Sequence, residues 1–530
     1  MTALLHNLLI DTAERTPAAT ALRHKKETVS YETLAQDIHS AAAGLIHLGL
    51  ERNERVGIYL PKSFSTVTAF FAATCAGGVF VPINPVLKSP QVQHILQDCN
   101  IRVLITSADR LKLLSSALAH CHDLNTVVLL ESTIPELEDK PHYRIVCWDE
   151  FRDASTSTTP INRIDRDMAG IFYTSGSTGK PKGVVLSHLN MVAGAHSVAR
   201  YLENTANDRL LAVLPFSFDY GFSQLSTAFS VGASVTLLDY LLPRDVVKVV
   251  QKDQITGLAA VPPLWIKLSE LDWPEETSEH LRYITNSGGA MPQATLAELR
   301  KQLPKTRPYL MYGLTEAFRS TYLPPEEIDK RPGSMGKAIP NAEVMVVRAD
   351  GTECAPGEPG ELVHRGSLVS MGYWNDPEKT AIRFKPAPNS ESGIQLTEMA
   401  VWSGDTVKKD EDGFLYFVGR TDEMIKTSGY RVSPTEIEEE IYKTGLVSEV
   451  IALGIPHPEL GQAIVLIVVP LEDSSFDENE LTTHCKKNLP NFMVPANIFS
   501  KTALPRNPNG KIDRKTVALE YHEMYQEEKE

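Results

Sequence analysis

The first half of the chain alternates short β-branched runs with helical patterns, and this rhythm constrains the fold more than any other feature. Runs of this kind occupy residues 102–106, 126–130, 210–214, 233–238 and 256–261. Strands that alternate with helices build a wound α/β sheet with helices on its faces. We therefore expect a large N-terminal wound α/β domain.

One repeat of this pattern shows where such a fold places a binding site. The sequence predicts a strand over 281–285, a glycine turn over 286–290 and an amphipathic helix over 293–303. The turn then lies at the carboxyl end of a strand. Open α/β sheets usually bind their ligands at this edge.

The pattern changes after about residue 340. Residues 343–347 and 360–364 indicate two strands, and Asp350-Gly351 indicates the turn between them. Long helical patterns are rare in this stretch. We expect a small antiparallel β unit attached to the large domain.

A second change follows at about Asp422. Ser433 opens a Ser-Pro-Thr-Glu capping box, which predicts a helix start, and residues 465–469 indicate a strand. We divide the chain into an N-terminal domain over 1–421 and a small, mobile α+β domain over 422–530. A length of roughly 100 residues is ordinary for a domain.

Charge and cysteine content exclude several classes of function. Lys and Arg total 52 against 67 Asp and Glu, which gives a formal charge of -15 and no excess to neutralise nucleic-acid phosphates. The six cysteines lie far apart without a Cys-x-x-Cys spacing, so we expect neither a metal cluster nor a disulfide framework. No signal peptide or membrane-spanning run is evident. We expect a cytoplasmic protein.

A glycine-rich segment, Tyr173-Thr-Ser-Gly-Ser-Thr-Gly-Lys-Pro-Lys-Gly183, follows an apolar run and precedes a helix predicted to begin near Ser187. Glycines let backbone N–H groups approach an anion, while hydroxyls and lysines add donors and charge, so the segment predicts a polyphosphate cradle. Its spacing differs from that of a Walker A loop. The residues predicted to contact the nucleotide here are Thr174, Ser175, Gly176, Ser177, Thr178, Gly179 and Lys182.

This loop resembles the signature loop of the adenylate-forming superfamily, which contains acyl- and aryl-CoA synthetases, amino-acid adenylation domains and beetle luciferases. The resemblance covers essentially the whole chain, because further motifs occur in the family's order. These motifs are Asn286-Ser-Gly-Gly-Ala290, Tyr312-Gly-Leu-Thr-Glu316, Ser403-Gly-Asp405, Gly419-Arg420 and Asn509-Gly-Lys511.

The resemblance implies a role for each motif. It implies that Tyr312 stacks on adenine, Thr315 contacts the α-phosphate, Glu316 helps to hold Mg²⁺, Asp405 accepts hydrogen bonds from the ribose hydroxyls and Lys511 is the catalytic lysine. Further residues of the nucleotide site, by the same resemblance, are Gly288, Gly289, Ala290, Gly313 and Arg420. ATP and Mg²⁺ are the implied cofactors.

The mechanism that follows is activation of a carboxylic acid as its acyl-adenylate, because a carboxylate is a poor electrophile until AMP becomes its leaving group. Lys511 and magnesium on Glu316 would neutralise the charge that develops at the α-phosphate. In the resembling family the small domain then swings to admit a thiol. By resemblance, Asp422 occupies the hinge and Gly429 lies in the loop that lines the thiol tunnel.

The Phe218-Asp219 pair is the part of the sequence that bears on which acid is activated. Many fatty-acyl and aryl synthetases carry histidine in place of Phe218, whereas the Phe-Asp pair resembles amino-acid adenylation domains, in which the aspartate pairs with the substrate's α-ammonium. A buried carboxylate is costly unless a cation meets it, which favours the same interpretation. The alternative is that Asp219 caps a helix or faces solvent.

Over its whole length the chain is most similar to bacterial stand-alone acyl-CoA ligases found with exosortase and exopolysaccharide systems. No Gly-Gly-x-Ser acceptor site is present, so the thiol is expected in trans, from CoA or from a phosphopantetheinyl carrier protein. An amino- or imino-acid ligase that loads a stand-alone carrier is the alternative. Hypotheses from other classes are a luciferase-like oxidase, a kinase or ATPase, and a noncatalytic acyl-binding regulator.

Overall fold

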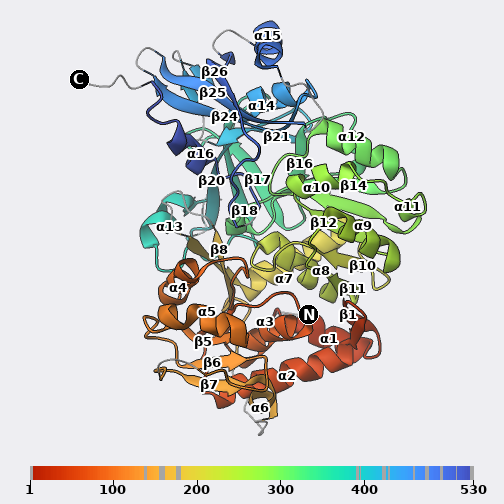
Figure 1. The fold of residues 1–530 in the computed structure, drawn as a ribbon, viewed down its shortest axis with the longest axis vertical. Coiled ribbons are helices and arrows are strands. Elements are labelled where there is room, and N and C mark those ends of the chain that lie inside the picture. Colours follow the sequence, from red (N-terminus) through yellow and green to blue (C-terminus); the bar gives the residue numbers. More distant parts are fainter. Residues whose placement is uncertain are drawn as a thin grey trace.

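The computed structural model describes residues 4–525 apart from 137–139, 154–161, 175–180, 389–392, 394, 421–424, 428–429, 458–459, 472–476, 490–492 and 509. The described residues form three sheets, two in the large N-terminal domain and one in the smaller C-terminal domain. Figure 1 shows the C-terminal domain, in blue, seated at one end of the molecule above the β strands of the large domain.

The first sheet has the strand order β7-β6-β5-β3-β4-β8-β9, with every neighbouring pair parallel except β8 and β9. Its strands are β3 (Arg55–Ile58), β4 (Val79–Pro82), β5 (Ile101–Thr106), β6 (Thr126–Leu129), β7 (Arg144–Cys147), β8 (Met168–Thr174) and β9 (Lys182–Ser187). The helices within this stretch are α3 (Phe64–Ala76), α4 (Ser89–Asp98), α5 (Ala108–Leu118) and α6 (Trp148–Asp153). This arrangement confirms a wound α/β unit.

The second sheet begins as a parallel sheet and ends as an antiparallel one, because β14 pairs in parallel with β13 but antiparallel with β15. Its parallel half contains β1 (Thr20–His24), β10 (Arg209–Ala212), β11 (Ser234–Leu237), β12 (Gly257–Ala260), β13 (Tyr283–Asn286) and β14 (Arg307–Tyr312), with β2 (Glu27–Ser30) at the edge. Its antiparallel half contains β15 (Thr321–Leu323), β16 (Ser334–Ala338), β17 (Ala342–Val347), β18 (Gly360–Gly366), β19 (Phe384–Pro386), β20 (Met399–Lys409) and β21 (Leu415–Arg420). The predicted antiparallel β unit is therefore continuous with the wound sheet.

Helices alternate with the strands of this part of the chain. They are α1 (Asn7–Arg15), α2 (Tyr31–His47), α7 (His188–Tyr201), α8 (Asp219–Val231), α9 (Pro243–Lys252), α10 (Pro262–Ser269), α11 (Thr277–His280), α12 (Gln293–Gln302) and α13 (Pro377–Arg383), with short 3₁₀ turns η1 (Thr315–Ala317) and η2 (Pro325–Glu327). None of the helices among the described residues is long and apolar enough to cross a membrane.

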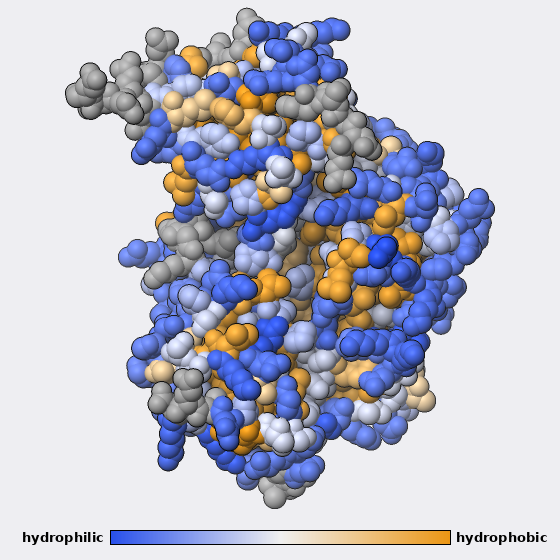
Figure 2. Space-filling view, viewed as in Figure 1, coloured by the Kyte–Doolittle hydropathy of each residue, from blue (hydrophilic) through white to orange (hydrophobic). Residues whose placement is uncertain are grey.

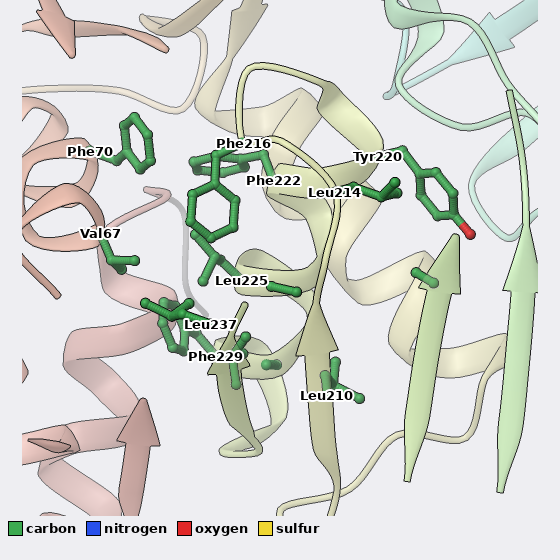
Figure 3. Packing of buried hydrophobic residues seen from close by; sticks show 14 of the residues in the cluster. Val67, Phe70, Leu210, Leu214, Phe216, Tyr220, Phe222, Leu225, Phe229 and Leu237 are labelled. Atoms are coloured by element: carbon green, nitrogen blue, oxygen red, sulfur yellow. The ribbon is translucent and has the colours of Figure 1, made fainter. Parts of the chain in front are cut away.

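Helices α3 and α8 pack against each other in the core of the large domain. The rings of Phe70 and Phe71 on α3 contact Phe222 on α8, and Phe80 stacks on Phe222 with centroids 4.9 Å apart. Figure 3 shows the ring of Phe70 on α3 beside those of Phe216 and Phe222. Residues 219–229 of α8 are all buried, so this helix lies inside the core. The rigid packing fixes the start of α8, where Asp219 lies.

The C-terminal domain contains the third sheet, with the order β23-β22-β25-β24 and β26 paired to β25. Its elements are β22 (Ile425–Thr427), β23 (Tyr430–Val432), α14 (Pro434–Tyr442), β24 (Val447–His457), β25 (Gly461–Pro470), α15 (Glu478–Asn488), β26 (Asn497–Ser500) and α16 (Arg514–Glu520). Separate apolar clusters cover its two faces. The predicted α+β architecture is confirmed, whereas the predicted boundary at Asp422 falls outside the described residues.

One local prediction was confirmed and one was wrong. The helix predicted near Ser187 is α7, which begins at His188 with Ser187 as its N-cap, and β9 lies between this helix and the glycine-rich loop. Helix α14 starts where the capping box placed it, yet the Ser433 hydroxyl donates to the carbonyl of Val418 and makes no cap. A contact outside the helix thus replaces the predicted cap.

Candidate active site

The phosphate loop is held at its base by two paired strands. Thr174 ends β8 and Lys182 begins β9, and the two residues are register partners. The hydroxyl oxygen of Thr174 is buried and has no hydrogen-bond partner among the described residues. The predicted contacts at 175–179 lie outside the described residues. An orphaned hydroxyl at the loop's base leaves a donor for an anionic ligand.

Glu316, on the 3₁₀ turn η1, is the centre of a buried polar cluster. Its Oε1 atom lies 3.1 Å from the Nζ of Lys182 and accepts a hydrogen bond of 2.5 Å from the Tyr373 hydroxyl. Lys182 Nζ also lies 2.7 Å from that hydroxyl and 4.0 Å from the centroid of the tyrosine ring. The structure thus brings Lys182, the last residue of the predicted phosphate loop, next to the predicted metal carboxylate.

The cluster keeps the Glu316 carboxylate ionised. Burial opposes ionisation, but the Lys182 ammonium and the hydrogen bond from Tyr373 hold the pKa of Glu316 below its usual range. An ionised carboxylate is the oxygen ligand that Mg²⁺ prefers. Sequence reasoning did not single out Tyr373, because a tyrosine that follows a glycine carries no signal for this role.

Tyr312 and Asp405 form one wall of the predicted nucleotide site. Tyr312 ends β14, and its hydroxyl donates to Oδ2 of Asp405 on β20. Asp405 is also the register partner of Arg420 on β21, whose side chain lies outside the described residues. The residues predicted to contact adenine and ribose therefore lie side by side, although they are 93 residues apart.

A glycine turn forms another part of the site. Gly288 follows β13 with a φ of +81°, a conformation that other residues rarely adopt. The side-chain amide of Asn286 closes this turn by donating to the carbonyl of Gly289 at 2.9 Å. A Cβ atom on Gly288 would lie 3.4 Å from Cε of Lys511 and 3.6 Å from Cζ of Phe218. These are ordinary van der Waals distances, so the turn at 288 lies directly against Lys511 and Phe218.

Lys511 comes from the C-terminal domain and reaches this site. Its Nζ atom lies 5.7 Å from the centroid of the Phe218 ring, and its charge acts on the Asp219 carboxylate. Residues from the large domain and the C-terminal domain thus meet at the start of α8. Its predicted action on the α-phosphate stays a prediction.

Asp219 is buried and already paired within the chain. Its Oδ2 atom lies 3.1 Å from Nη1 of Arg319, and the two side chains are only 4% and 3% exposed. Arg319 also donates to the Ser223 hydroxyl at 2.8 Å. Burial raises the pKa of Asp219, although the charges of Arg319 and Lys511 oppose this.

The pair removes one argument for an amino-acid substrate. We expected the cation that meets Asp219 to be a substrate ammonium, whereas Arg319 supplies it. Asp219 does not face solvent, and it is the first residue of α8 rather than its N-cap, which is Phe218. Its predicted role in substrate binding is left as a prediction. Arg319 was missed, because nothing local in the sequence marks it.

Phe318 links Glu316 to Arg319 through a strained turn. Its φ and ψ are +55° and −49°, and the N–H of Arg319 donates to the carbonyl of Ala317 at 2.6 Å. This is the rare γ-turn with positive φ, which is uncommon for a large side chain. The buried Phe318 ring packs on Gly194, where an added Cβ would lie only 2.3 Å from Cδ1. Packing therefore holds the turn.

Two further predicted residues have no described geometry. Asp422 and Gly429 lie outside the described residues, so their roles at the hinge and the thiol tunnel remain predictions.

Figure 2 shows a largely hydrophilic face, with hydrophobic side chains gathered around its middle below the C-terminal domain.

Comparison with known families decides the identity of this site. Residues 9–374 match the family model described as AMP-binding enzyme, and residues 436–511 match the one described as AMP-binding enzyme C-terminal domain. The chain belongs to the AMP-binding enzyme family. The predicted membership in the adenylate-forming superfamily is thereby confirmed.

Relatives of this AMP-binding enzyme include both long and short proteins. It is 30% identical over 523 residues to tyrocidine synthase 3 of Brevibacillus parabrevis, with 97% of the chain covered, but it spans only 8% of that protein's length. It is 30% identical over 526 residues to the L-proline--[L-prolyl-carrier protein] ligase of Pseudomonas fluorescens, with 97% of the chain and 99% of the relative covered.

Solved structures share the fold of this AMP-binding enzyme. ATP-bound MatB from Rhodopseudomonas palustris superposes with a TM-score of 0.86 at 25% identity, covering 99% of this chain and all of the other. The o-succinylbenzoate CoA synthetase MenE from Bacillus subtilis, in complex with its acyl-adenylate intermediate, gives 0.81 at 26% identity, covering 96% and 97%. The predicted fold class is confirmed.

The residues of the site fit ATP and a divalent cation. Thr174 leaves an orphaned buried donor for a phosphate, Lys182 supplies positive charge beside it, and Glu316 supplies an ionised carboxylate. Among the described residues no group of three or more His, Cys, Asp or Glu side chains gathers to hold a metal. A cation here would thus share its coordination between Glu316 and the ligand's phosphates, as Mg²⁺ usually does.

Proposed function

We propose that the chain is an AMP-forming ligase that activates a carboxylic acid with ATP as an acyl-adenylate and transfers the acyl group to a thiol. The observation that carries the proposal is the position of Lys511. The C-terminal domain places this ammonium beside Phe218 and Gly288, on the same side of the fold as the predicted acid pocket. A kinase or an ATPase does not activate a carboxylic acid, so it would not need a cation beside an acid pocket.

The chemistry follows from the charges that these residues supply. The acid's carboxylate attacks the α-phosphorus of ATP, a P–O bond forms, and pyrophosphate leaves. Two anions must approach each other in this step, so Lys511 lowers their repulsion by contacting both, and Lys182 balances charge on the phosphate side. Mg²⁺ on Glu316 would supply further neutralisation of the phosphates. Removal of one such group typically costs about 100- to 1000-fold in rate.

The products of ATP cleavage test the proposal. We expect AMP and pyrophosphate in equal amounts, only when a carboxylic acid is present. The measurement is chromatographic separation of labelled nucleotides after incubation with ATP, Mg²⁺ and mixed acids. ADP as the main product would refute the proposal and favour a kinase or ATPase. Oxygen uptake with a supplied adenylate would favour the luciferase-like oxidase.

The acid remains to be identified among two classes. The Phe218-Asp219 pair and the likeness to a prolyl-carrier ligase support an amino or imino acid. The internal pairing of Asp219 with Arg319 and the likeness to a CoA synthetase support an acid without an ammonium group. A carboxylate-dependent pyrophosphate-exchange screen over amino, imino, fatty and aryl acids separates the classes. If Asp219 binds an ammonium, Asp219→Ala lowers the preference for an amino acid over its deaminated analogue.

The thiol is proposed to arrive in trans, from CoA or from a carrier protein with a phosphopantetheine arm. The two donors differ in size and in their contacts, so a direct comparison identifies the acceptor. The assay supplies the acyl-adenylate found in the screen and follows thioester formation with CoA or with a purified carrier. Cytoplasmic location also stays a prediction.

The proposed movement of the C-terminal domain makes Lys511 specific to one half-reaction. Lys511→Ala should abolish adenylate formation and leave thioester formation from a supplied adenylate largely intact. Asp422→Pro, which restricts φ at the predicted hinge, should have the opposite effect. Single-turnover measurements of each half-reaction test both variants. Equal losses in both halves for folded Lys511→Ala would show that the lysine is structural.

A further inference from the structure

Asn84 joins the large domain to the turn that carries Lys511. It lies two residues beyond the end of β4 and is only 4% exposed. Its Nδ2 group donates to the carbonyl of Pro508 at 2.9 Å, across 424 residues of sequence. Its Oδ1 atom accepts from the N–H of Val86 at 3.1 Å. The two ends of the amide thus have separate tasks, one within its own loop and one across the domains.

The Lys511 turn is built by the C-terminal domain itself. The N–H of Asn507 donates to the carbonyl of Lys511 at 2.8 Å, and the N–H of Lys511 donates to Oδ1 of Asn507 at 3.0 Å. Gly510 supports the turn with a φ of +81°, and Arg506 donates to its carbonyl at 2.8 Å. The turn therefore keeps its shape independently of the large domain. Its placement over the active site needs a contact from outside.

We propose that Asn84 is a positioning residue, which docks the preformed Lys511 turn on the large domain for adenylate formation and releases it for thiol transfer. The inference rests on the proposed function, since it assigns Asn84 to one of the two half-reactions. Pro508 lies three residues before Lys511, so a hydrogen bond to its carbonyl fixes the direction from which the lysine enters.

A single neutral hydrogen bond suits a contact that must form and break in each cycle. Such a bond changes the equilibrium constant between the closed and the released pose of the C-terminal domain by about 2- to 12-fold. This is enough to favour the closed pose and too little to prevent the domain from leaving. Burial of Asn84 protects the bond from competition with water, and the Val86 contact orients the donor toward Pro508.

Asn84→Asp separates the two tasks of the side chain. The variant keeps the shape of the residue and the oxygen that accepts from Val86, but an oxygen replaces the donor and faces the Pro508 carbonyl. Asn84→Ala removes both contacts without adding charge and serves if the buried carboxylate prevents folding. Asn207→Asp is the matched control, because it makes the same charge change at an exposed turn whose backbone contacts Thr205.

The test measures the two half-reactions separately with L-proline, octanoate and benzoate as probe acids. Pyrophosphate exchange reports adenylate formation, and single-turnover transfer from the synthetic adenylate of the best acid reports thioester formation. We expect Asn84→Asp to lower the exchange kcat at least about 10-fold and Asn84→Ala about 2- to 12-fold, with the KM for ATP and the transfer rate within about twofold of wild type. Asn207→Asp should match wild type in both.

Two results would overturn the inference. Exchange at the wild-type rate in folded Asn84→Asp and Asn84→Ala would show that the contact does not position Lys511. Equal losses in both half-reactions would show that Asn84 only supports the fold. A wild-type protein that exchanges pyrophosphate with none of the probe acids and releases ADP would instead refute the proposed function, and the inference with it.

Discussion

Breaking the buried pair of Asp219 and Arg319 should strongly destabilise the large domain. The perturbation is Asp219→Ala, which leaves the Arg319 guanidinium in place without its carboxylate. Arg319 would keep its hydrogen bonds to the Phe318 carbonyl and the Ser223 hydroxyl, at 2.6 and 2.8 Å, but neither group carries a compensating charge. A buried cation with only neutral partners is costly.

The burial of both side chains sets the magnitude. Exposures of 4% and 3% place this pair in the class for which removal of one partner costs about 3–5 kcal/mol of unfolding free energy. Replacement of both charges together, as in Asp219→Asn with Arg319→Met, should cost less than the sum of the single changes, because no unpaired charge remains. The difference between the cost of the double change and the sum of the two single costs is the coupling energy of the pair.

Tryptophan fluorescence isolates the relevant domain. All five tryptophans, at positions 148, 265, 273, 374 and 402, precede the predicted domain boundary. Urea unfolding followed by this signal therefore reports the large domain without interference from the C-terminal one. The control is Asp329→Ala, which breaks the exposed pair with Arg300 in the same domain and should shift the unfolding midpoint far less.

A small loss of unfolding free energy in Asp219→Ala would refute this reasoning. If Asp219→Ala costs less than about 1 kcal/mol, the pair behaves as a solvated one, and Arg319 does not carry an uncompensated charge after the substitution. In that case the charge argument for a substrate ammonium at Asp219 regains its force. The same variant thus informs both stability and the choice of acid.

Two further predictions concern other buried groups. Tyr373→Phe removes the hydroxyl that contacts Glu316. In the pyrophosphate-exchange assay, the kcat/KM for ATP should fall about 10- to 100-fold, and a higher Mg²⁺ concentration should be needed. An unchanged Mg²⁺ dependence would contradict the role assigned to Tyr373. Burial lowers the pKa of His6 to about 3 and the pKa values of His188 and His364 to about 4. Each of these histidines therefore stays neutral in the folded protein, whereas in the unfolded protein it gains a proton below about pH 6.5. Stability should therefore fall as pH drops from 6.5 toward 4.5, by about 1.4 kcal/mol per pH unit for each histidine, and His364→Asn should make the urea-measured slope shallower.

The sequence predicted those parts of the fold and the site that depend on local patterns. Glycine positions, β-branched runs and motif order located β13, α12 and the residues around Glu316 and Lys511. These signals are local because turn geometry and strand periodicity depend on neighbouring residues. The wound α/β architecture followed from the same rhythm. Strand β9 was missed because Lys182 and Gly183, at its start, were assigned to the glycine-rich loop.

The contacts that organise the site could not be predicted, since each joins distant segments. Arg319 meets Asp219 across 100 residues, Tyr373 meets Lys182 across 191, and Asn84 meets Pro508 across 424. Nothing in the neighbourhood of an arginine, tyrosine or asparagine shows which partner the fold will bring to it. The missing information is tertiary, and it concerns the positioning residues more than the motif residues.

The strained turn at Phe318 connects the predicted phosphate site to the predicted acid pocket. Glu316 and Arg319 are three residues apart, yet one lies with Lys182 and the other with Asp219. A helix would carry positions i and i+3 on the same face, so the chain must reverse between them, and the γ-turn at Phe318 does this. Such a conformation persists only when its surroundings hold it. The ring of Phe318, seated on Gly194, supplies that hold and so fixes both charged groups relative to each other.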